Sequence, residues 1–139
     1  MTNRNKSLLP LLLRVSVALV WLHEGLWMKV VHRDPHELSI VTAVGTPFGL
    51  STVQFLAVIG IGEVLIAFAV LIGILRRPIA WLQIALILAM NLTAIFGGHG
   101  VISEPVGLLI HNLPLLLCIW LAGYMTTDRP TVSVPSVRP

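Results

Sequence analysis

Four long apolar segments, each of the length that a membrane-spanning helix needs, decide the class of fold. They are Leu8–Val31, Val53–Leu75, Ile79–Gly97 and Val106–Met125, and about 20 apolar residues suffice to cross a bilayer as a helix. Hydrophobic residues make up 56% of the chain and charged residues 11%, whereas soluble proteins carry about 25% charged residues. The sequence therefore predicts an integral membrane protein with the lipid bilayer as its partner. It excludes a soluble globule and, because no basic face remains for phosphates, a nucleic-acid partner.

The segments indicate helices, because a backbone in lipid must satisfy its own polar groups in a helix or a closed barrel. None of them shows the alternating apolar and polar residues of barrel strands. Short second and third connections favour an up-down-up-down arrangement. We expect an all-α polytopic four-transmembrane-helix bundle, with residues 1–125 as one domain. Residues 126–139, rich in Pro, Ser, Thr and Val, are expected to form a flexible cytoplasmic tail.

The distribution of basic residues predicts the orientation of this bundle, because Lys and Arg are retained on the cytoplasmic side. Only Lys29 and Arg33 fall on one side, and the other seven of the nine Lys and Arg residues fall on the opposite side. Both termini are therefore expected in the cytoplasm, with the protein in the cell membrane. A cleaved signal peptide is the alternative for the first segment, but Arg14 interrupts its apolar run and no small-residue cleavage site follows.

The first loop carries the sequence pattern of a helix start. Asp34 can cap the helix, Pro35 suits its first position, and Glu37 stands three residues after the cap. Gly45 can end the helix. The pattern predicts a short helix over residues 35–44, lying at the outer membrane surface.

Polar residues within the spans are the candidates for a site, because an ionisable group near the bilayer centre costs about 2.5–3.5 kcal/mol and usually faces a partner or a cavity. Glu63 is the most deeply placed of them, on a face with Gly60. At about 1.5 Å per helical residue, Glu24, Asn91 and His111 fall in the outer half of the bundle, with Glu63 slightly below them. The candidate ligand-binding residues are Glu63, Arg14, Glu24, Asn91, His23, His111 and Asn112, and His99 lies at a similar depth.

Each candidate also has a structural interpretation. Glu63 could pair with Arg14, Asn91 or His23 to set the helix register. Arg14 and Lys29 can extend to opposite interfaces, which needs no ligand. His23 and His111 could together ligate haem or a metal, but interhelical hydrogen bonding is the preferred interpretation. His32 and His36 have the spacing of a helical metal pair, but Pro35 leaves His32 outside the helix, and no metal is expected. The single cysteine, Cys118, excludes a thiol redox pair and is expected to be a small buried hydrophobe.

Several motifs, taken in order, resemble the DoxX-like family of small four-helix membrane proteins. They are RVSVALVWLHEGLWMKVV, DPHEL, GIGEVLIAFAVLIGILRR and HNLPLL, between Leu13 and Leu121. The resemblance implies an arginine near the start of the first helix, a Gly-x-x-x-Lys at its end and an acidic residue in the second helix. Arg14, Gly25, Lys29 and Glu63 match these positions. Family members often carry a lysine before the fourth-helix asparagine, where this chain has His111 before Asn112, so no role of that lysine is carried over.

The resemblance implies a link with membrane oxidoreductase systems, including a subunit of a thiosulfate:quinone oxidoreductase. The first hypothesis is a membrane subunit that supports an oxidoreductase partner protein and holds a quinone or a small sulfur species. The alternatives are a small-molecule permease or binding protein, and a structural anchor for a partner enzyme. Catalysis by this chain alone is not expected, because it carries no recognisable electron-carrying motif. Quinone is the candidate cofactor; haem is not expected, and the substrate and a homo-oligomeric state are left open.

Overall fold

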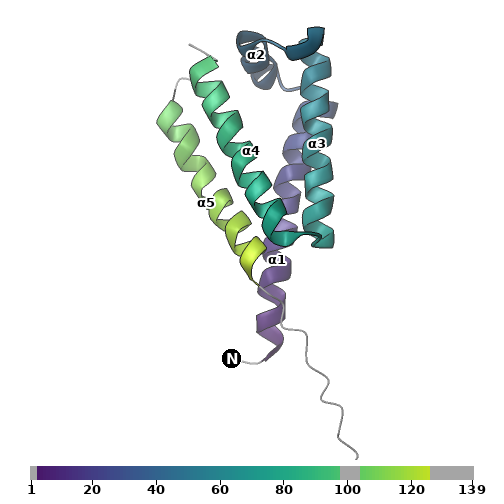
Figure 1. The fold of residues 1–139 in the computed structure, drawn as a ribbon, viewed down its shortest axis with the longest axis vertical. Helices are drawn as coiled ribbons and strands as arrows, with labels where there is room; N and C mark the ends of the chain where they lie inside the picture. The colour runs from purple at the N-terminus through teal and green to yellow at the C-terminus, as the bar shows by residue number, and fades with distance from the viewer. Residues whose placement is uncertain (1–2, 98–103, 126–139) are drawn as a thin grey trace, which may run out of the picture.

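The structure is a computed structural model that describes residues 3–97 and 104–125, and these residues form helices and no strand (Figure 1). The elements in chain order are α1 (Asn3–Leu22), a π-helix η1 (His23–Val31) that continues it, α2 (Pro35–Val44), a 3-10 turn (Pro47–Gly49), α3 (Thr52–Ile72), α4 (Arg76–Gly97) and α5 (Pro105–Tyr124). Leu8–Val31, α3, α4 and α5 are long and apolar enough to span a membrane. The expected all-α bundle is confirmed. His99 and the tail at 126–139 lie outside the described residues.

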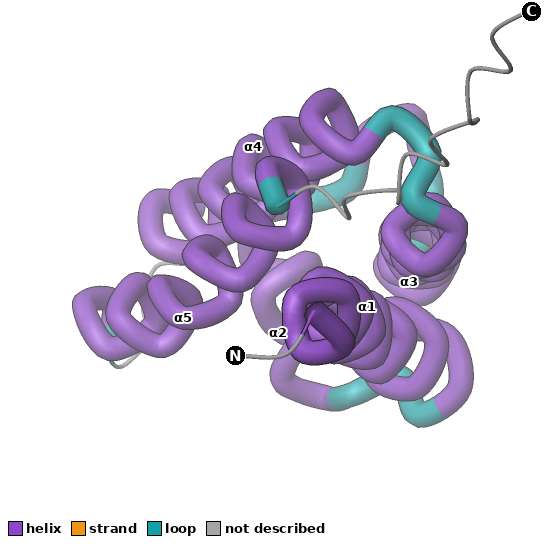
Figure 2. The backbone as a smooth tube through the Cα atoms, turned by 90° about the horizontal axis from the view of Figure 1, so that it is seen from below, coloured by secondary structure: helices purple, strands orange, loops and turns teal. Residues whose placement is uncertain are grey.

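The four long helices form two pairs. The continuous helix of α1 and η1 packs along α3, α4 packs along α5, and α5 also contacts α1. Viewed along the bundle, the two pairs lie side by side (Figure 2). They approach each other near α1 and diverge toward the end where α2 contacts both α3 and α4 (Figure 1). This end is called the α2 end below, and the other is called the Arg14 end.

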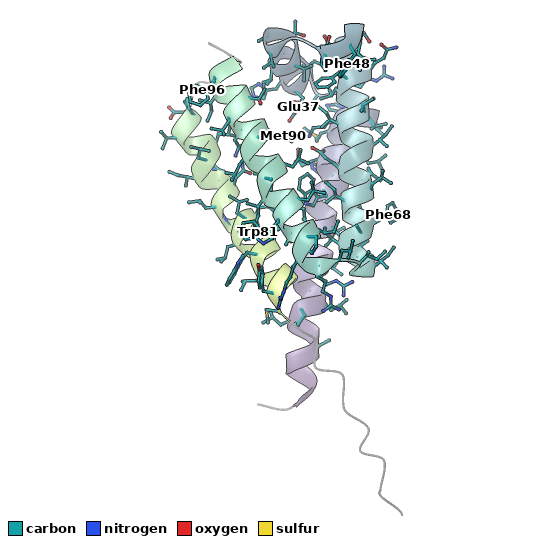
Figure 3. The ribbon with its side chains drawn as sticks, viewed as in Figure 1. Glu37, Phe48, Phe68, Trp81, Met90 and Phe96 are labelled. Carbon is teal, nitrogen blue, oxygen red and sulfur yellow. The ribbon has the colours of Figure 1, made fainter. Side chains whose placement is uncertain are left out.

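The helix faces that the sequence marks as small or polar point into the bundle. On α3 the buried face includes Gly60, Glu63 and Ala67, and on α4 it includes Gln83 and Asn91. Many large apolar side chains remain exposed on the outside of the bundle, among them Phe68, Trp81 and Phe96 (Figure 3). An apolar outer surface is what a lipid-facing bundle requires, because lipid tails are as apolar as these side chains.

The predicted short helix over residues 35–44 is confirmed, with the expected cap. The Asp34 side chain accepts a hydrogen bond from the Glu37 backbone N–H at 3.3 Å, Pro35 occupies the first turn, and Gly45 ends the helix with a φ of 87°. α3 ends at Ile72, before the predicted Leu75, because Gly73 adopts the left-handed conformation with a φ of 76°. α4 begins at Arg76, one turn earlier than predicted.

The end of the first span differs from the regular α-helix that its sequence suggests. Residues His23–Val31 form a π-helix, in which backbone hydrogen bonds join residues five apart; the His32 N–H, for example, donates to the Trp27 carbonyl at 2.7 Å. The wider turn changes which side chains face inward. The buried residues here are Gly25 and Lys29, and Met28, three residues after Gly25, is only half-buried.

Candidate functional site

An ion pair between Lys29 of η1 and Glu63 of α3 lies inside the bundle. The Lys29 Nζ is 3.1 Å from the Glu63 Oε2, and each side chain is only 2% exposed. Two charges at this depth stabilise each other, and removing Lys29 would leave Glu63 buried without a counter-charge. The pair thus links the first and second spans. Lys29 and Glu63 are also the two charged residues that are buried among the described residues.

The backbone geometry of two glycines allows this pair to form. A Cβ built on Gly25 would lie 2.6 Å from the Gly60 carbonyl oxygen and 2.7 Å from the Glu63 Cβ. Such distances leave no room for any side chain, so η1 and α3 approach through their backbones. Lys29 stands one turn beyond Gly25, and Glu63 stands one turn from Gly60. The glycine contact therefore brings the ammonium and the carboxylate to the same level.

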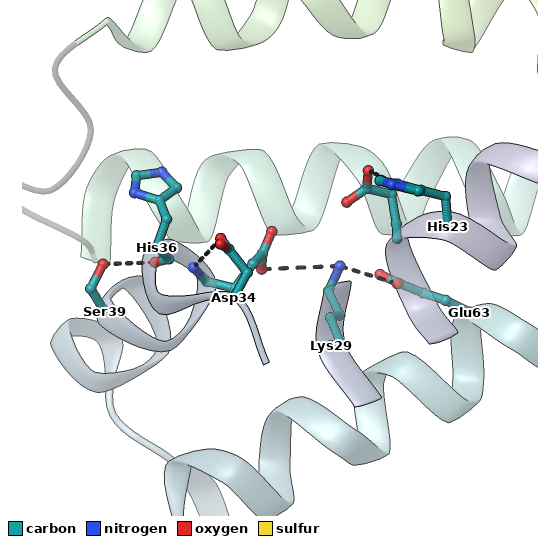
Figure 4. A network of polar contacts seen from close by, with 8 residues as sticks. His23, Lys29, Asp34, His36, Ser39 and Glu63 are labelled. Atoms are coloured by element: carbon teal, nitrogen blue, oxygen red, sulfur yellow. Dashed lines mark hydrogen bonds and ion pairs between the residues drawn. The ribbon is translucent and has the colours of Figure 1, made fainter. Parts of the chain in front are cut away.

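A second carboxylate reaches Lys29 from α2. The Glu37 Oε2 lies 4.0 Å from the Lys29 Nζ, at the outer limit of an ion pair, and its side chain is 26% exposed. Figure 4 shows the resulting row, in which Lys29 lies between the α2 carboxylate and Glu63. The row contains two carboxylates and one ammonium, so Lys29 needs no further negative group to compensate its charge.

A cavity of about 340 Å³ lies at the α2 end, between η1, α2, α3 and α4. Its walls are mainly apolar and include Leu56, Ile59 and Met90, and its polar groups include Lys29, Glu37 and Asn91. Ligand pockets in proteins run from about 300 to 1,000 Å³ and combine apolar walls with a few placed polar groups. The cavity has the size and the character of a small-molecule site.

Asn91 contributes an unused hydrogen-bond donor to this cavity. Its Oδ1 accepts a hydrogen bond from the Asn112 Nδ2 at 3.1 Å. Its own Nδ2 has no partner within the described part of the chain, although the residue is only 7% exposed. Buried donors without partners are rare and costly, so this amide is suited to a ligand that accepts a hydrogen bond.

Arg14 does not belong to this group, and its expected proximity to Glu63 is wrong. Its Nε donates to the Val70 carbonyl at 2.9 Å, and its Nη2 donates to the Leu71 carbonyl. These carbonyls lie at the C-terminal end of α3, about 10 Å along the helix from Glu63. A cation at this position satisfies carbonyls that the helix leaves unbonded and complements the helix dipole. Arg14 is thus a cap for α3 at the Arg14 end.

The histidine candidates are also placed elsewhere. His23 is 59% exposed and contacts its neighbour Glu24, itself 42% exposed, at 3.3 Å, and neither lines the cavity. His111 is exposed and bonds to the Gly107 carbonyl at 2.7 Å. Within residues 3–97 and 104–125, no group of three His, Cys, Asp or Glu side chains could hold a metal. Of the seven sequence candidates, Glu63, Asn91 and Asn112 remain at or next to the cavity.

The sequence reasoning missed two residues of the site. Lys29 matches the Gly-x-x-x-Lys of the family resemblance but was interpreted as extending to the interface; it lies in the π-helix and is only 2% exposed. Glu37 was expected only to support the start of α2. The sequence did carry a signal that α2 packs against the bundle, and with it Glu37. Ile40, Val41 and Val44 make α2 more apolar than a helix surrounded by water needs to be. That apolar face lines the cavity.

Comparison with known proteins supports the family resemblance. No curated protein and no solved structure matches the chain. The sequence profile of the DoxX-like family matches residues 18–120, which include η1, α2, α3, α4 and most of α5. The chain is therefore a multi-pass membrane protein that belongs to the DoxX-like family.

Proposed function

We propose that this protein is a membrane subunit that supports an oxidoreductase system by holding a quinone in the cavity at the α2 end. One observation carries the proposal: a mainly apolar cavity is lined by two buried residues that carry hydrogen-bond donors, Lys29 and Asn91, and the Asn91 amide has no partner in the described part of the chain. A quinone ring is apolar on its faces and has carbonyl oxygens that only accept hydrogen bonds. The donors and the walls of the cavity fit these two properties.

The charges around the cavity distinguish a quinone from a small sulfur oxyanion. Glu37 and Glu63 together outnumber the single ammonium of Lys29. An anion such as thiosulfate would face two carboxylates in a surrounding of low dielectric, where like charges repel strongly. A neutral acceptor does not meet this repulsion. Among the ligands that the family resemblance suggests, the electrostatics favour the quinone.

The residues of this chain would bind and orient the quinone, and the quinone would supply the electron-transfer chemistry. Asn91 would donate to one carbonyl oxygen, with its orientation fixed by the hydrogen bond from Asn112. Lys29, held by Glu63, would offer a second donor. The electrons would pass to or from a partner protein, so the chain acts as a subunit in a redox system.

Equilibrium dialysis of the purified, detergent-solubilised protein against decylubiquinone tests this proposal. We expect saturable binding, and we expect Asn91→Leu to weaken it about tenfold, as the loss of one hydrogen bond to a buried acceptor does. Thiosulfate, tested in parallel, should not bind.

Gln83→Leu is the matched control, since it also replaces a buried amide on the inner face of α4. Gln83 accepts from the Trp21 Nε1 at 2.7 Å and does not line the cavity, so this variant should bind decylubiquinone as wild type does. Circular dichroism must show that both variants are folded. Absence of saturable decylubiquinone binding to the wild type would contradict the proposal, and binding of thiosulfate alone would replace the quinone with a sulfur species.

A further inference from the structure

The wall of the cavity formed by α2 is held less firmly than the walls formed by α3 and α4. Among the residues of α2, only Val41 is buried, whereas α3 buries six residues and α4 five. Both ends of α2 are flanked by residues with positive φ, Arg33 at 52° and Gly45 at 87°. Helices with few buried contacts open at lower free energy than the core of the fold.

Lys29 makes two charged contacts, and the one with Glu37 of α2 is weaker than the one with Glu63 of α3. Glu37 stands 4.0 Å from the Lys29 Nζ, and Glu63 stands at 3.1 Å. When Glu37 moves away, Lys29 keeps its partner Glu63 and is not left uncompensated. Glu37 is itself partly exposed and can move into water. The interior pair therefore stays intact while the α2 contact breaks.

From these observations we infer that α2 is the gate of the cavity, and that the contact between Glu37 and Lys29 holds the gate closed. Five residues of α2 form its inner side: His36, Glu37, Ile40, Val41 and Val44. Movement of α2 opens the cavity, and a ligand that accepts a hydrogen bond from Lys29 replaces Glu37 there. The inference rests on the proposed function for the identity of the ligand, but the movement of α2 can be measured without any ligand.

The first test measures this movement by the reactivity of a buried thiol. Leu56 lines the cavity and is 1% exposed, so Leu56→Cys in a Cys118→Ala background reacts with N-ethylmaleimide only when the cavity opens. We expect Glu37→Gln to raise the labelling rate about two- to fivefold, which corresponds to the loss of one partly exposed ion pair. Ile59→Cys, also in the wall, serves as a second reporter if Leu56→Cys does not fold.

Glu24→Gln is the matched control for this test, because it removes a carboxylate from η1 that does not line the cavity. It should leave the labelling rate unchanged. Equal labelling rates with Glu37 and with Glu37→Gln would overturn the inference.

The second test locks α2 to α4 with a disulfide. A Cβ built on Gly97 lies 3.6 Å from the Val44 Cβ, within the range of about 3.5–4.5 Å that a disulfide requires. In the oxidised Val44→Cys/Gly97→Cys variant, also with Cys118→Ala, uptake of decylubiquinone should be slow. The rate of decylubiquinone uptake should return to that of the Cys118→Ala protein after the disulfide is reduced and the reductant is removed.

The two tests separate the gate from the proposed function. If the oxidised variant took up the quinone as fast as the reduced one, α2 would not be the gate. If Glu37→Gln accelerated labelling but no variant bound decylubiquinone, the gate would stand and the quinone proposal would fail.

Discussion

The backbones of Gly25 and Gly60 are in direct contact. A Cβ on Gly60 would lie 2.5 Å from the Gly25 carbonyl oxygen, and a Cβ on Gly25 would lie 2.6 Å from the Gly60 carbonyl oxygen. Each glycine thus needs the other to lack a side chain. Gly25→Ala and Gly60→Ala should each lower the free energy of unfolding by about 1–3 kcal/mol, the cost of overpacking a close contact. Unfolding in detergent micelles, followed by circular dichroism, measures this change.

Gly62 is the matched control, since it lies on the same helix and a Cβ built there meets nothing within 4 Å. Gly62→Ala should leave stability unchanged or raise it by up to about 1 kcal/mol, because alanine is the better helix former. Equal losses at positions 60 and 62 would contradict the backbone contact.

The Lys29–Glu63 pair should show strong coupling in a double-mutant cycle. Lys29→Met leaves Glu63 buried without a counter-charge, and Glu63→Leu leaves Lys29 with only the 4.0 Å contact to Glu37. Each change should cost about 3–5 kcal/mol. The variant with both Lys29→Met and Glu63→Leu should lose much less than the sum, because no charge is then stranded. Additive losses in the free energy of unfolding would mean that the two side chains do not interact.

The cap of α2 should be measurable by itself. Asp34→Ala removes the acceptor for the Glu37 N–H, a loss that costs about 0.5–2 kcal/mol at a helix N-terminus. Amide hydrogen exchange should become faster across residues 37–44 and stay unchanged in α3 and α4. Unchanged exchange in α2 would show that packing alone holds this helix.

The orientation in the membrane follows from the charge distribution and remains a prediction. In a Cys118→Ala background, Ser39→Cys on α2 should react with a membrane-impermeant maleimide added to intact cells. Ser136→Cys in the C-terminal segment should react only after the cells are permeabilised. The reverse result would place the α2 end in the cytoplasm.

The parts of the fold that were predictable are those that local spacing determines. The inner faces of α3 and α4 follow from the positions of Glu63, Gln83 and Asn91 along a regular helix, and α2 follows from Asp34 and Pro35. Lys29 stands four residues after the buried Gly25, a spacing that fits one helix face, but spacing alone could not show that its ammonium pairs with Glu63 inside the bundle and does not extend to the interface.

Contacts between helices were less predictable than the helices themselves. Depth along the spans put Glu24 among the neighbours of Glu63, and opposite charge made Arg14 a possible partner. Neither depth nor charge gives the direction in which a side chain extends around the bundle. Arg14 instead bonds to the α3 carbonyls near Gly73, and Glu24 faces outward beside His23. Three-dimensional packing decides these partners.

The buried pair has a consequence for how the chain enters the membrane. Lys29 belongs to the first span and Glu63 to the second, and either charge alone near the bilayer centre would cost about 2.5–3.5 kcal/mol. The first span is therefore most stable in lipid once the second has been synthesised and has joined it. We therefore expect the first two segments to enter the bilayer together as a hairpin, because a nascent chain that stops at Val44 offers Lys29 only the partly exposed Glu37 at 4.0 Å and lacks its buried partner Glu63.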